Sequence, residues 1–375
     1  MNDGRVFFTL YVTALSMGLA YGTHAPLIPV FARDMLGANY TEVGLIGMSN
    51  YLPYAFFPFF VGILLDRFNR MLILLLGLVM ALTSIAALSM VDSIMYLALL
   101  RGVSGIAHAF FWPSAESMIV GKGVKSISRF TLLWVVGYMV GPLIGSSLFN
   151  LGYTMLFIYS SLMILPALVC ISITYKGIDY ANRRISIRGI KSILRDRILL
   201  ALMIMYYSAS FAIVLSILPS YMNDNGIDEQ SIGYLFFVFG IARLITLTTV
   251  HKIAALEGKG IAIASIVIAL AMLNIYMYVT PYTISLSMLA FGFAFSVYFP
   301  VTLSMMARGV SSSLVGSIVG VYETIFGIGW ASAPLLSGIT ADTLGTDTPY
   351  LLIFILGIGL TALYILKGDL HRTSS

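Results

Sequence analysis

Four ionisable side chains lie deep inside long apolar runs of this sequence, where a charge is costly. Arg101 and His108 share one run, His24 lies in another and Glu323 in a third. An ionisable group at the centre of a hydrocarbon layer costs about 3 kcal/mol or more, and a carboxyl or imidazole group there can bind and release a proton. The four residues are therefore candidates for proton coupling.

Three of these residues also have a purely structural interpretation. Arg101 could form a static salt bridge, His108 a hydrogen-bonded packing contact, and Glu323 a fixed pair with an internal arginine. On a helix, Arg101, Gly105, His108 and Trp112 fall within an arc of about 60°. This spacing predicts one polar and aromatic stripe that faces a water-filled cavity.

Aromatic and amide side chains deep in other apolar runs are expected to line the same cavity, which would accept flat, apolar solutes. Pro26 and Pro29, next to His24, should interrupt helical hydrogen bonding, as in helices broken at a substrate site. Ordinary packing is the alternative for each aromatic residue. The predicted cavity residues are Asn50, Tyr54, Trp112, Tyr138 and Trp330.

The elements that would position these residues are membrane-spanning helices. Apolar residues make up 59 % of the chain and charged residues 10 %, whereas a soluble domain averages about 25 % charged residues. A helix of about 20 apolar residues crosses the hydrocarbon, so we expect an all-α polytopic membrane protein. The twelve predicted spans are 6–31, 43–65, 71–91, 94–120, 130–149, 153–175, 198–222, 230–250, 261–279, 282–307, 313–338 and 348–366.

Basic residues fall mainly on one side of these spans. All but three of the 21 Lys and Arg residues occur at the termini or in alternate connections, and the positive-inside rule makes that side cytoplasmic. The exceptions are Arg33, on the other side, and Arg101 and Arg243, within spans. We expect Arg243 to snorkel toward its cytoplasmic end. Both termini are predicted to be cytoplasmic, in a multi-pass protein of the cell membrane.

One long polar connection divides the chain into two halves of six spans. The predicted domains are residues 1–175 and 198–375, and the basic linker 176–197 between them is expected to contain an amphipathic helix. Segments repeat between corresponding spans, which indicates a duplicated six-span unit typical of transporters. The matching pairs are 105–118 with 292–305, 136–145 with 328–337, and LIPVFARD (27–34) with ILPSYMND (217–224).

The charged loop GILLDRFNR (62–70) is similar to the loop between spans 2 and 3 of the major facilitator superfamily, Gly-x-x-x-Asp-Arg-x-Gly-Arg. Gly62, Asp66, Arg67 and Arg70 match, and Asn69 replaces the second glycine. We expect asparagine to be accepted there because it tolerates a left-handed conformation. The resemblance covers the whole chain and implies two six-helix bundles with a cytoplasmic latch. In that latch Asp66 would meet the start of the eleventh span, at Ser311, Ser312 and Ser313; a simple stop-turn is the alternative.

Two further motifs resemble those of proton-driven members of this family. RGVSGIAHA (101–109) matches Arg-x-x-x-Gly-x-x-x-Ala, in which the arginine is implied to assist proton coupling or to bind anionic groups. GYMVGPLIG (137–145) is similar to the antiporter signature Gly-x-x-x-Gly-Pro-x-x-Gly-Gly, with Ser146 at the last glycine. Small-residue packing is the alternative for the second motif. Its matching residues are Gly137, Gly141, Pro142 and Gly145.

These patterns predict a secondary active transporter rather than an enzyme. The sequence has no phosphate loop, nucleophile triad or Cys/His metal set, so no catalytic residue, metal or cofactor is expected, and a proton or other ion gradient would drive transport.

The leading hypothesis is proton-coupled efflux of small amphipathic molecules by alternating access. The alternatives are an uptake symporter or facilitator for a small polar or anionic nutrient, and a membrane ligand sensor that does not transport. The expected partners are a small-molecule substrate and the lipid bilayer, without nucleic acid, and the protein is expected to be monomeric.

Overall fold

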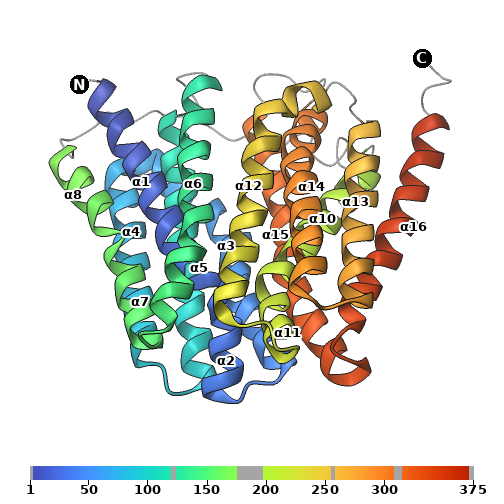
Figure 1. Cartoon of the computed structure of the whole chain (residues 1–375). Helices are drawn as coiled ribbons and strands as arrows, with labels where there is room; N and C mark the ends of the chain where they lie inside the picture. The colour runs from blue at the N-terminus through green and yellow to red at the C-terminus, as the bar shows by residue number, and fades with distance from the viewer. Residues whose placement is uncertain (1–2, 120–123, 175–196, 255–257, 308–314, 371–375) are drawn as a thin grey trace.

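The computed structural model describes residues 3–119, 124–174, 197–254, 258–307 and 315–370, and these residues form helices without strands (Figure 1). The first half consists of α1 (Asp3–His24), η1 (Ala25–Leu27), α2 (Ile28–Leu36), α3 (Tyr40–Arg67), α4 (Arg70–Ala87), η2 (Leu88–Met90), α5 (Ile94–Ile119), α6 (Val124–Phe149), α7 (Tyr153–Leu162) and α8 (Leu165–Thr174). The second half consists of α10 (Ile198–Ser216), α11 (Leu218–Asp224), α12 (Glu229–Ala254), α13 (Gly258–Met277), α14 (Pro281–Ala307), α15 (Val315–Leu344) and α16 (Thr348–Leu370).

The helices have the length and composition of membrane spans. Eleven helical segments in the described part of the chain are long and apolar enough to cross a membrane. The remaining predicted span, 43–65, lies within α3, which has 28 residues. The prediction of an all-α, multi-pass membrane fold is therefore confirmed.

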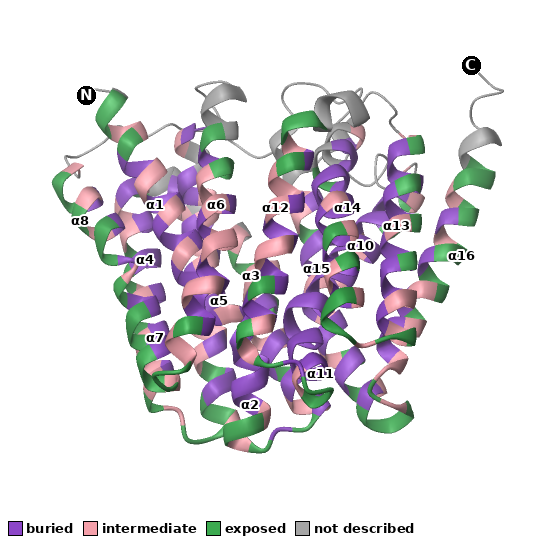
Figure 2. Ribbon diagram, in the orientation of Figure 1, coloured by how far each residue is buried: buried purple, intermediate pink, exposed green. Residues whose placement is uncertain are grey.

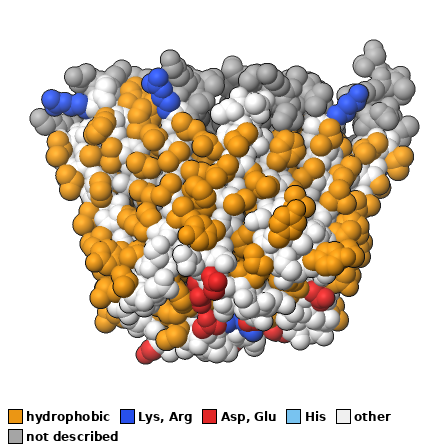
Figure 3. All heavy atoms as spheres, in the orientation of Figure 1, with side chains coloured by type: hydrophobic (Ala, Val, Ile, Leu, Met, Phe, Trp, Pro, Cys, Tyr) orange, Lys and Arg blue, Asp and Glu red, His pale blue; other side chains and the backbone are white. Residues whose placement is uncertain are grey.

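The outer surface is apolar between two polar ends. Figure 3 shows hydrophobic side chains over most of the visible face, with most visible Lys and Arg at one end and Asp and Glu, beside a further basic side chain, toward the other. Helix α1 begins and helix α16 ends at the basic end, which we call the terminal end; α2 and α11 lie at the opposite, far end (Figure 1). Large apolar side chains such as Ile173 and Ile245 are exposed on helix surfaces, and Figure 2 shows buried residues on the inner faces. Such a surface suits lipid rather than water.

The predicted interruption near Pro26 and Pro29 is confirmed. Helix α1 ends at His24, a single 3-10 turn follows over Ala25–Leu27, and α2 continues from Ile28. Proline lacks an N–H group and fixes its own backbone, so the regular hydrogen-bond series cannot run through this segment. The second half repeats the feature, because α10 ends at Ser216 and α11 begins one residue before Pro219.

Helix contacts also repeat between the halves. Helix α1 packs on α6 as α10 packs on α15, α3 packs on α5 as α12 packs on α14, and α4 packs on α5 as α13 packs on α14. The halves meet along two seams of the same kind, α3 with α15 and α6 with α12. The seams are close: a Cβ atom on Gly44 would collide with the Pro334 carbonyl, and one on Gly233 would lie 2.7 Å from the Pro142 carbonyl oxygen.

The division into domains 1–175 and 198–375 stays a prediction. The boundary segment and the predicted amphipathic helix within 176–197 lie outside the described residues. What the described residues add is the repeated contact pattern, which is the arrangement expected of a duplicated six-span unit.

Candidate functional site

Arg101 lies on α5 at the junction of the two halves, and it is 4 % exposed. With the Asn50 amide oriented to fit, that amide donates to the Arg101 carbonyl oxygen at 3.2 Å and accepts from Arg101 Nη2 at 3.3 Å. Nε and Nη1 of Arg101 have no hydrogen-bond partner among the described residues. Arg101 borders a cavity of about 20 Å³ whose lining also includes Tyr51 and, from the second half, Ser216, which is room for a single water molecule.

Both candidate histidines gather around Tyr21 close to Arg101. The ring centroids of Tyr21 and His108 lie 3.8 Å apart, and those of Tyr21 and His24 lie 5.2 Å apart. His24 Nδ1 lies 2.7 Å from the Ala20 carbonyl oxygen, while Nε2 of each histidine is buried without a partner among the described residues. Both histidines are close enough to Arg101 to interact with its charge. Three of the four predicted proton-coupling residues are thus brought together.

The fourth candidate, Glu323, lies in the other half. It is half-buried on α15 and interacts electrostatically with Tyr207 and Tyr322. Tyr207 also interacts with Arg243, so Glu323 and Arg243 share a neighbour within the second half. The coupling role of Glu323 stays a prediction.

The expectation that Arg243 snorkels is wrong. Its guanidinium carbon lies 4.7 Å from the ring centroid of Phe295 and 5.5 Å from that of Phe239. Its Nε is buried and has no hydrogen-bond partner among the described residues. The physical reason is that aromatic faces attract a cation at close range, so the side chain turns into the bundle instead of toward the membrane surface.

Aromatic rings connect the surroundings of the two arginines. Trp330 stacks on Tyr51 with centroids 4.8 Å apart, and it lies 5.8 Å from Phe211. Phe211 in turn lies 4.0 Å from Phe295, which carries Arg243 on its face. We call the set Arg101, Arg243, Tyr51, Tyr138, Phe211, Phe295 and Trp330 the central cluster; Tyr138 belongs to it because it interacts electrostatically with both arginines.

The predicted cavity residues divide between two aromatic groups. Tyr54 meets Trp330 edge to face at 6.3 Å, whereas Trp112 packs against Trp134 at 4.7 Å within the first half. Trp134 stacks on Tyr138 at 6.0 Å and so joins the two groups. Sequence reasoning missed Phe211 and Phe295. A phenylalanine in an apolar run looks the same in the sequence whether it lines a binding site or packs in the core.

The antiporter-like motif lies where α6 crosses α1. A Cβ atom on Gly137 would lie 2.6 Å from the Leu15 carbonyl oxygen, and one on Gly141 would lie 2.6 Å from the Thr23 backbone nitrogen. A Cβ on Gly145 would overlap the Thr23 carbonyl oxygen. These glycines permit close helix packing, and Pro142 of the same motif faces α12 across the seam. The motif therefore serves the packing of the first half and borders the second.

The predicted cytoplasmic gate falls largely outside the described residues. The structure does not describe the surroundings of Gly62, the side chains of Asp66 and Arg67, or the residues at 311–313, so the latch stays a prediction; Arg70 begins α4. The expectation of a left-handed Asn69 is wrong, since its φ is −61° and its ψ is 123°. Asn69 caps α4 instead: its side-chain oxygen accepts from the Met71 N–H at 2.9 Å, as N-cap asparagines commonly do.

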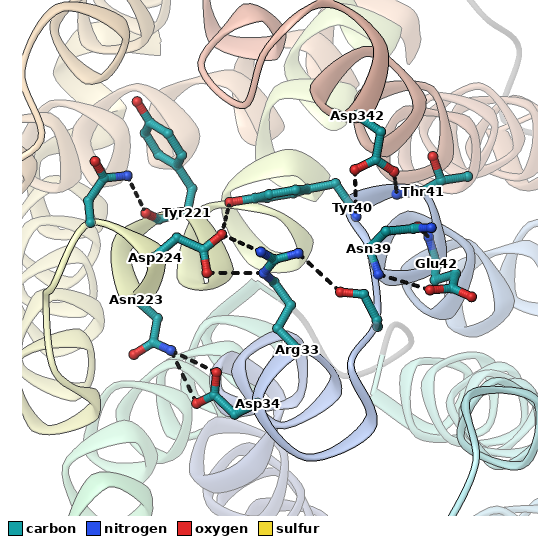
Figure 4. A network of polar contacts seen from close by, with 12 residues as sticks. Arg33, Asp34, Asn39, Tyr40, Thr41, Glu42, Tyr221, Asn223, Asp224 and Asp342 are labelled. Carbon is teal, nitrogen blue, oxygen red and sulfur yellow. Dashed lines mark hydrogen bonds and ion pairs between the residues drawn. The ribbon is translucent and has the colours of Figure 1, made fainter.

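A polar network that sequence reasoning missed joins the halves at the far end (Figure 4). Arg33 Nη2 pairs with Asp224 Oδ2 at 2.6 Å, and Arg33 Nε donates to Asp224 Oδ1 at 3.1 Å. The Tyr40 hydroxyl donates to Asp224 at 2.8 Å. Burial and the adjacent Asp224 carboxylate raise the pKa of Tyr40, so its hydroxyl remains the donor. The sequence did contain a signal for this ion pair, because Arg33 and Asp224 belong to the repeated segments 27–34 and 217–224.

Two further contacts complete this far-end network, which we define as Arg33, Asp34, Tyr40, Thr41, Asn223, Asp224 and Asp342. Asn223 Nδ2 donates to both carboxylate oxygens of Asp34 at 3.1 Å. Asp342 of α15 accepts from the backbone N–H groups of Tyr40, at 3.0 Å, and Thr41, at 2.6 Å. A carboxylate from one half thus caps the first turn of a helix in the other, where the helix dipole favours negative charge.

Comparisons with known proteins agree on one family. A profile of the family described as Major Facilitator Superfamily matches residues 10–255 and 198–374. The chain is 26 % identical over 359 residues to the "Multidrug efflux protein YfmO" of Bacillus subtilis (strain 168), covering 92 % of this chain and 87 % of that protein. It is 22 % identical over 293 residues to the "Proton-coupled antiporter flippase LtaA" of Staphylococcus aureus, covering 75 % of this chain and 74 % of that protein. A solved structure of the nucleoside transporter NupG superposes with a TM-score of 0.79 at 13 % identity, covering 98 % of this chain and 99 % of that one, which is a likeness of fold.

Proposed function

The chain belongs to the major facilitator superfamily and is a membrane transporter, and we propose that it exports small amphipathic molecules in exchange for protons. In this proposal the two halves rock about the seams α3 with α15 and α6 with α12. The substrate binds between them in the central cluster, and the two ends of the bundle open in turn.

One observation carries the proposal: the halves meet over a buried cluster of charges and aromatic rings that is closed on the far-end side by contacts between the halves. The Arg33–Asp224 pair and the bonds from Tyr40 and Thr41 to Asp342 connect the first half to the second. Polar contacts of this kind break and reform without disturbing the packing inside either half. A transporter with alternating access requires such a reversible closure around a central site.

Export and proton coupling draw support from the relatives. One is called a multidrug efflux protein and another a proton-coupled antiporter, and these names favour export over the uptake and sensor alternatives. His24, His108 and Glu323 are our candidates for the proton-binding groups. The terminal end would face the cytoplasm by the positive-inside rule, so the far-end network would close the outer side, and Asp66 would latch the cytoplasmic side in the opposite state.

Glu323→Gln tests the proposal in proteoliposomes. Naphthalene-based fluorescent probes of charge −1, 0 and +1 are screened for movement driven by an imposed pH gradient. We expect the wild-type protein to transport at least one of them. Because glutamine cannot exchange a proton, the variant should lose gradient-driven transport while still exchanging the probe between equal pH values. Glu229→Gln, which removes a carboxylate at the start of α12, is the matched control and should transport normally. Absence of gradient-driven movement of every probe in the wild-type protein would contradict proton-coupled export.

A further inference from the structure

We infer that the substrate is an organic anion: Arg101 binds its negatively charged group, and the aromatic rings of the central cluster hold a flat apolar body. Arg243 supplies a second positive charge along the same path. The inference deepens the proposed function, on which it rests, by naming the substrate class of the site.

Arg101 keeps two buried guanidinium nitrogens without a hydrogen-bond partner among the described residues. Arginine keeps its charge in proteins and presents five N–H donors in a rigid fork that suits carboxylates, sulfonates and phosphates. Here the Asn50 amide accepts only from Nη2, whereas Nε and Nη1 donate to none of the described residues. A buried donor without a partner costs about 1–3 kcal/mol, and more when it is charged. An anion that entered beside Arg101 would satisfy the two remaining directions.

Neither Arg101 nor Arg243 has a carboxylate partner among the described residues. Arg101 interacts electrostatically with Tyr51, Tyr21 and Tyr138 and with the two histidines His24 and His108. Arg243 interacts with Tyr207 and Tyr138. Two cations therefore create a positive potential in a region of low dielectric, where charges act strongly over distance. That potential attracts an anion and repels a cation.

Aromatic rings form a path between the two arginines. From the Arg101 cavity, Tyr51 leads to Trp330, Trp330 to Phe211, and Phe211 to Phe295 beneath Arg243, with centroid distances of 4.8, 5.8 and 4.0 Å. Aromatic walls suit a flat ring system, because stacked and edge-to-face contacts add to the burial of apolar area. An anion with an aromatic body therefore matches both parts of the site.

The space beside Arg101 sets a condition on binding. The cavity of about 20 Å³ holds one water molecule rather than a ring system. Its lining includes Ile46 and Gly47 of α3 and Leu215 and Ser216 of α10, which belong to different halves. The anion therefore enters when the halves separate at this junction.

Equilibrium binding tests the inference without any gradient. Wild-type protein in nanodiscs is titrated calorimetrically with naphthalene-2-sulfonate, with the cation (naphthalen-2-ylmethyl)trimethylammonium and with neutral 2-naphthalenemethanol. These probes share the ring system and differ in charge. We expect the sulfonate to bind at least about tenfold more tightly than the cation. Equal or tighter binding of the cation overturns the inference, and this comparison needs no variant.

Variants then locate the anion. Arg101→Gln should weaken sulfonate binding by about tenfold or more, Arg243→Gln by less, and Arg101→Lys should fall between wild type and Arg101→Gln. Binding of the neutral probe should change little in all three, whereas a loss of fold would reduce it equally. Arg5→Gln, which removes an exposed arginine, is the matched control. Sulfonate affinity that does not change in Arg101→Gln overturns the inference.

The two proposals fail in different ways. Selective sulfonate binding without gradient-driven transport would contradict proton-coupled export and leave the anion site standing. Gradient-driven transport of the cationic or neutral probe, without selective sulfonate binding, would support export and refute the anion site.

Discussion

The three arginines that lie away from the terminal end differ in one respect: Arg33 has a carboxylate partner, and Arg101 and Arg243 have none among the described residues. Arg33 lies in the far-end network, 24 % exposed, with Asp224 at 2.6 Å. Arg101 and Arg243 lie in the central cluster, where donors remain unused. The comparison separates a paired charge, which in our proposal holds one conformation, from unpaired charges, which in our proposal bind a ligand.

The charges of the two regions change the stability of the folded protein in opposite directions. A partly exposed ion pair contributes about 1 kcal/mol or less, although the additional bonds from Tyr40 and to Asp342 increase the total. An unpaired buried charge instead lowers stability, and replacing buried ionic groups with apolar side chains of similar volume is often stabilising. These magnitudes fit the proposed roles: contacts of the far-end network that are weak enough to break and reform, and a central cluster that lowers stability and would be kept for ligand binding.

The largest expected effect comes from replacing an arginine with methionine in the central cluster and, separately, in the far-end network. Arg101→Met should raise the apparent melting temperature of the purified protein, because it removes a buried and incompletely bonded cation, and it should reduce transport of an anionic probe at least about tenfold. Arg33→Met should lower the melting temperature by an amount corresponding to about 1 kcal/mol, because Asp224 loses its ion-pair partner and keeps only the bond from Tyr40. Thermal unfolding in detergent and flux in proteoliposomes measure the two effects. Destabilisation by both substitutions would remove the distinction between the regions.

Asp224→Asn should open the far end without affecting the central cluster. The variant loses the ion pair with Arg33, so the junction near Ser216 should become accessible more often. A membrane-impermeant maleimide would report this on a Ser216→Cys probe in a Cys170→Ser background, with labelling from the far-end side about tenfold faster. Asp228→Asn changes an acid at the same end whose carboxylate caps its own helix at Ser231, and it should label like the parent. Unchanged labelling in Asp224→Asn would show that the network is not a lock.

The smallest expected effect is that of Tyr40→Phe. This substitution keeps the ring under the Arg33 guanidinium, 4.4 Å away, and deletes only the hydroxyl that donates to Asp224. Because the Asp224 carboxylate is partly exposed, we take the typical value of about 1 kcal/mol for the loss of one hydrogen bond, so labelling of the same cysteine should rise by about fivefold, less than with Asp224→Asn. Tyr278→Phe, at an exposed tyrosine between α13 and α14, provides the control. An effect larger than that of Asp224→Asn would assign the lock to Tyr40 instead of the ion pair.

Much of the fold could be predicted because its signals are local. A run of apolar residues indicates a span, and the prolines at 26 and 29 indicate a break, wherever the rest of the chain lies. The site could be predicted only in part. Arg101, His24 and His108 were recognisable because ionisable residues are rare in apolar runs, whereas Phe211 and Phe295 look like any other core residues. Asn69 shows a further limit, since one residue type serves both left-handed turns and helix caps.

The sequence by itself determined that this chain is an all-helical membrane protein with repeated halves, because hydropathy and repetition are properties of short segments. Only the tertiary structure decided which charges are paired. Arg33 and Asp224 are 191 positions apart, and an ion pair depends on a separation of a few ångströms that no local pattern encodes. For the same reason the direction of the Arg243 side chain followed from the aromatic faces that folding placed beside it, and not from its distance along the helix.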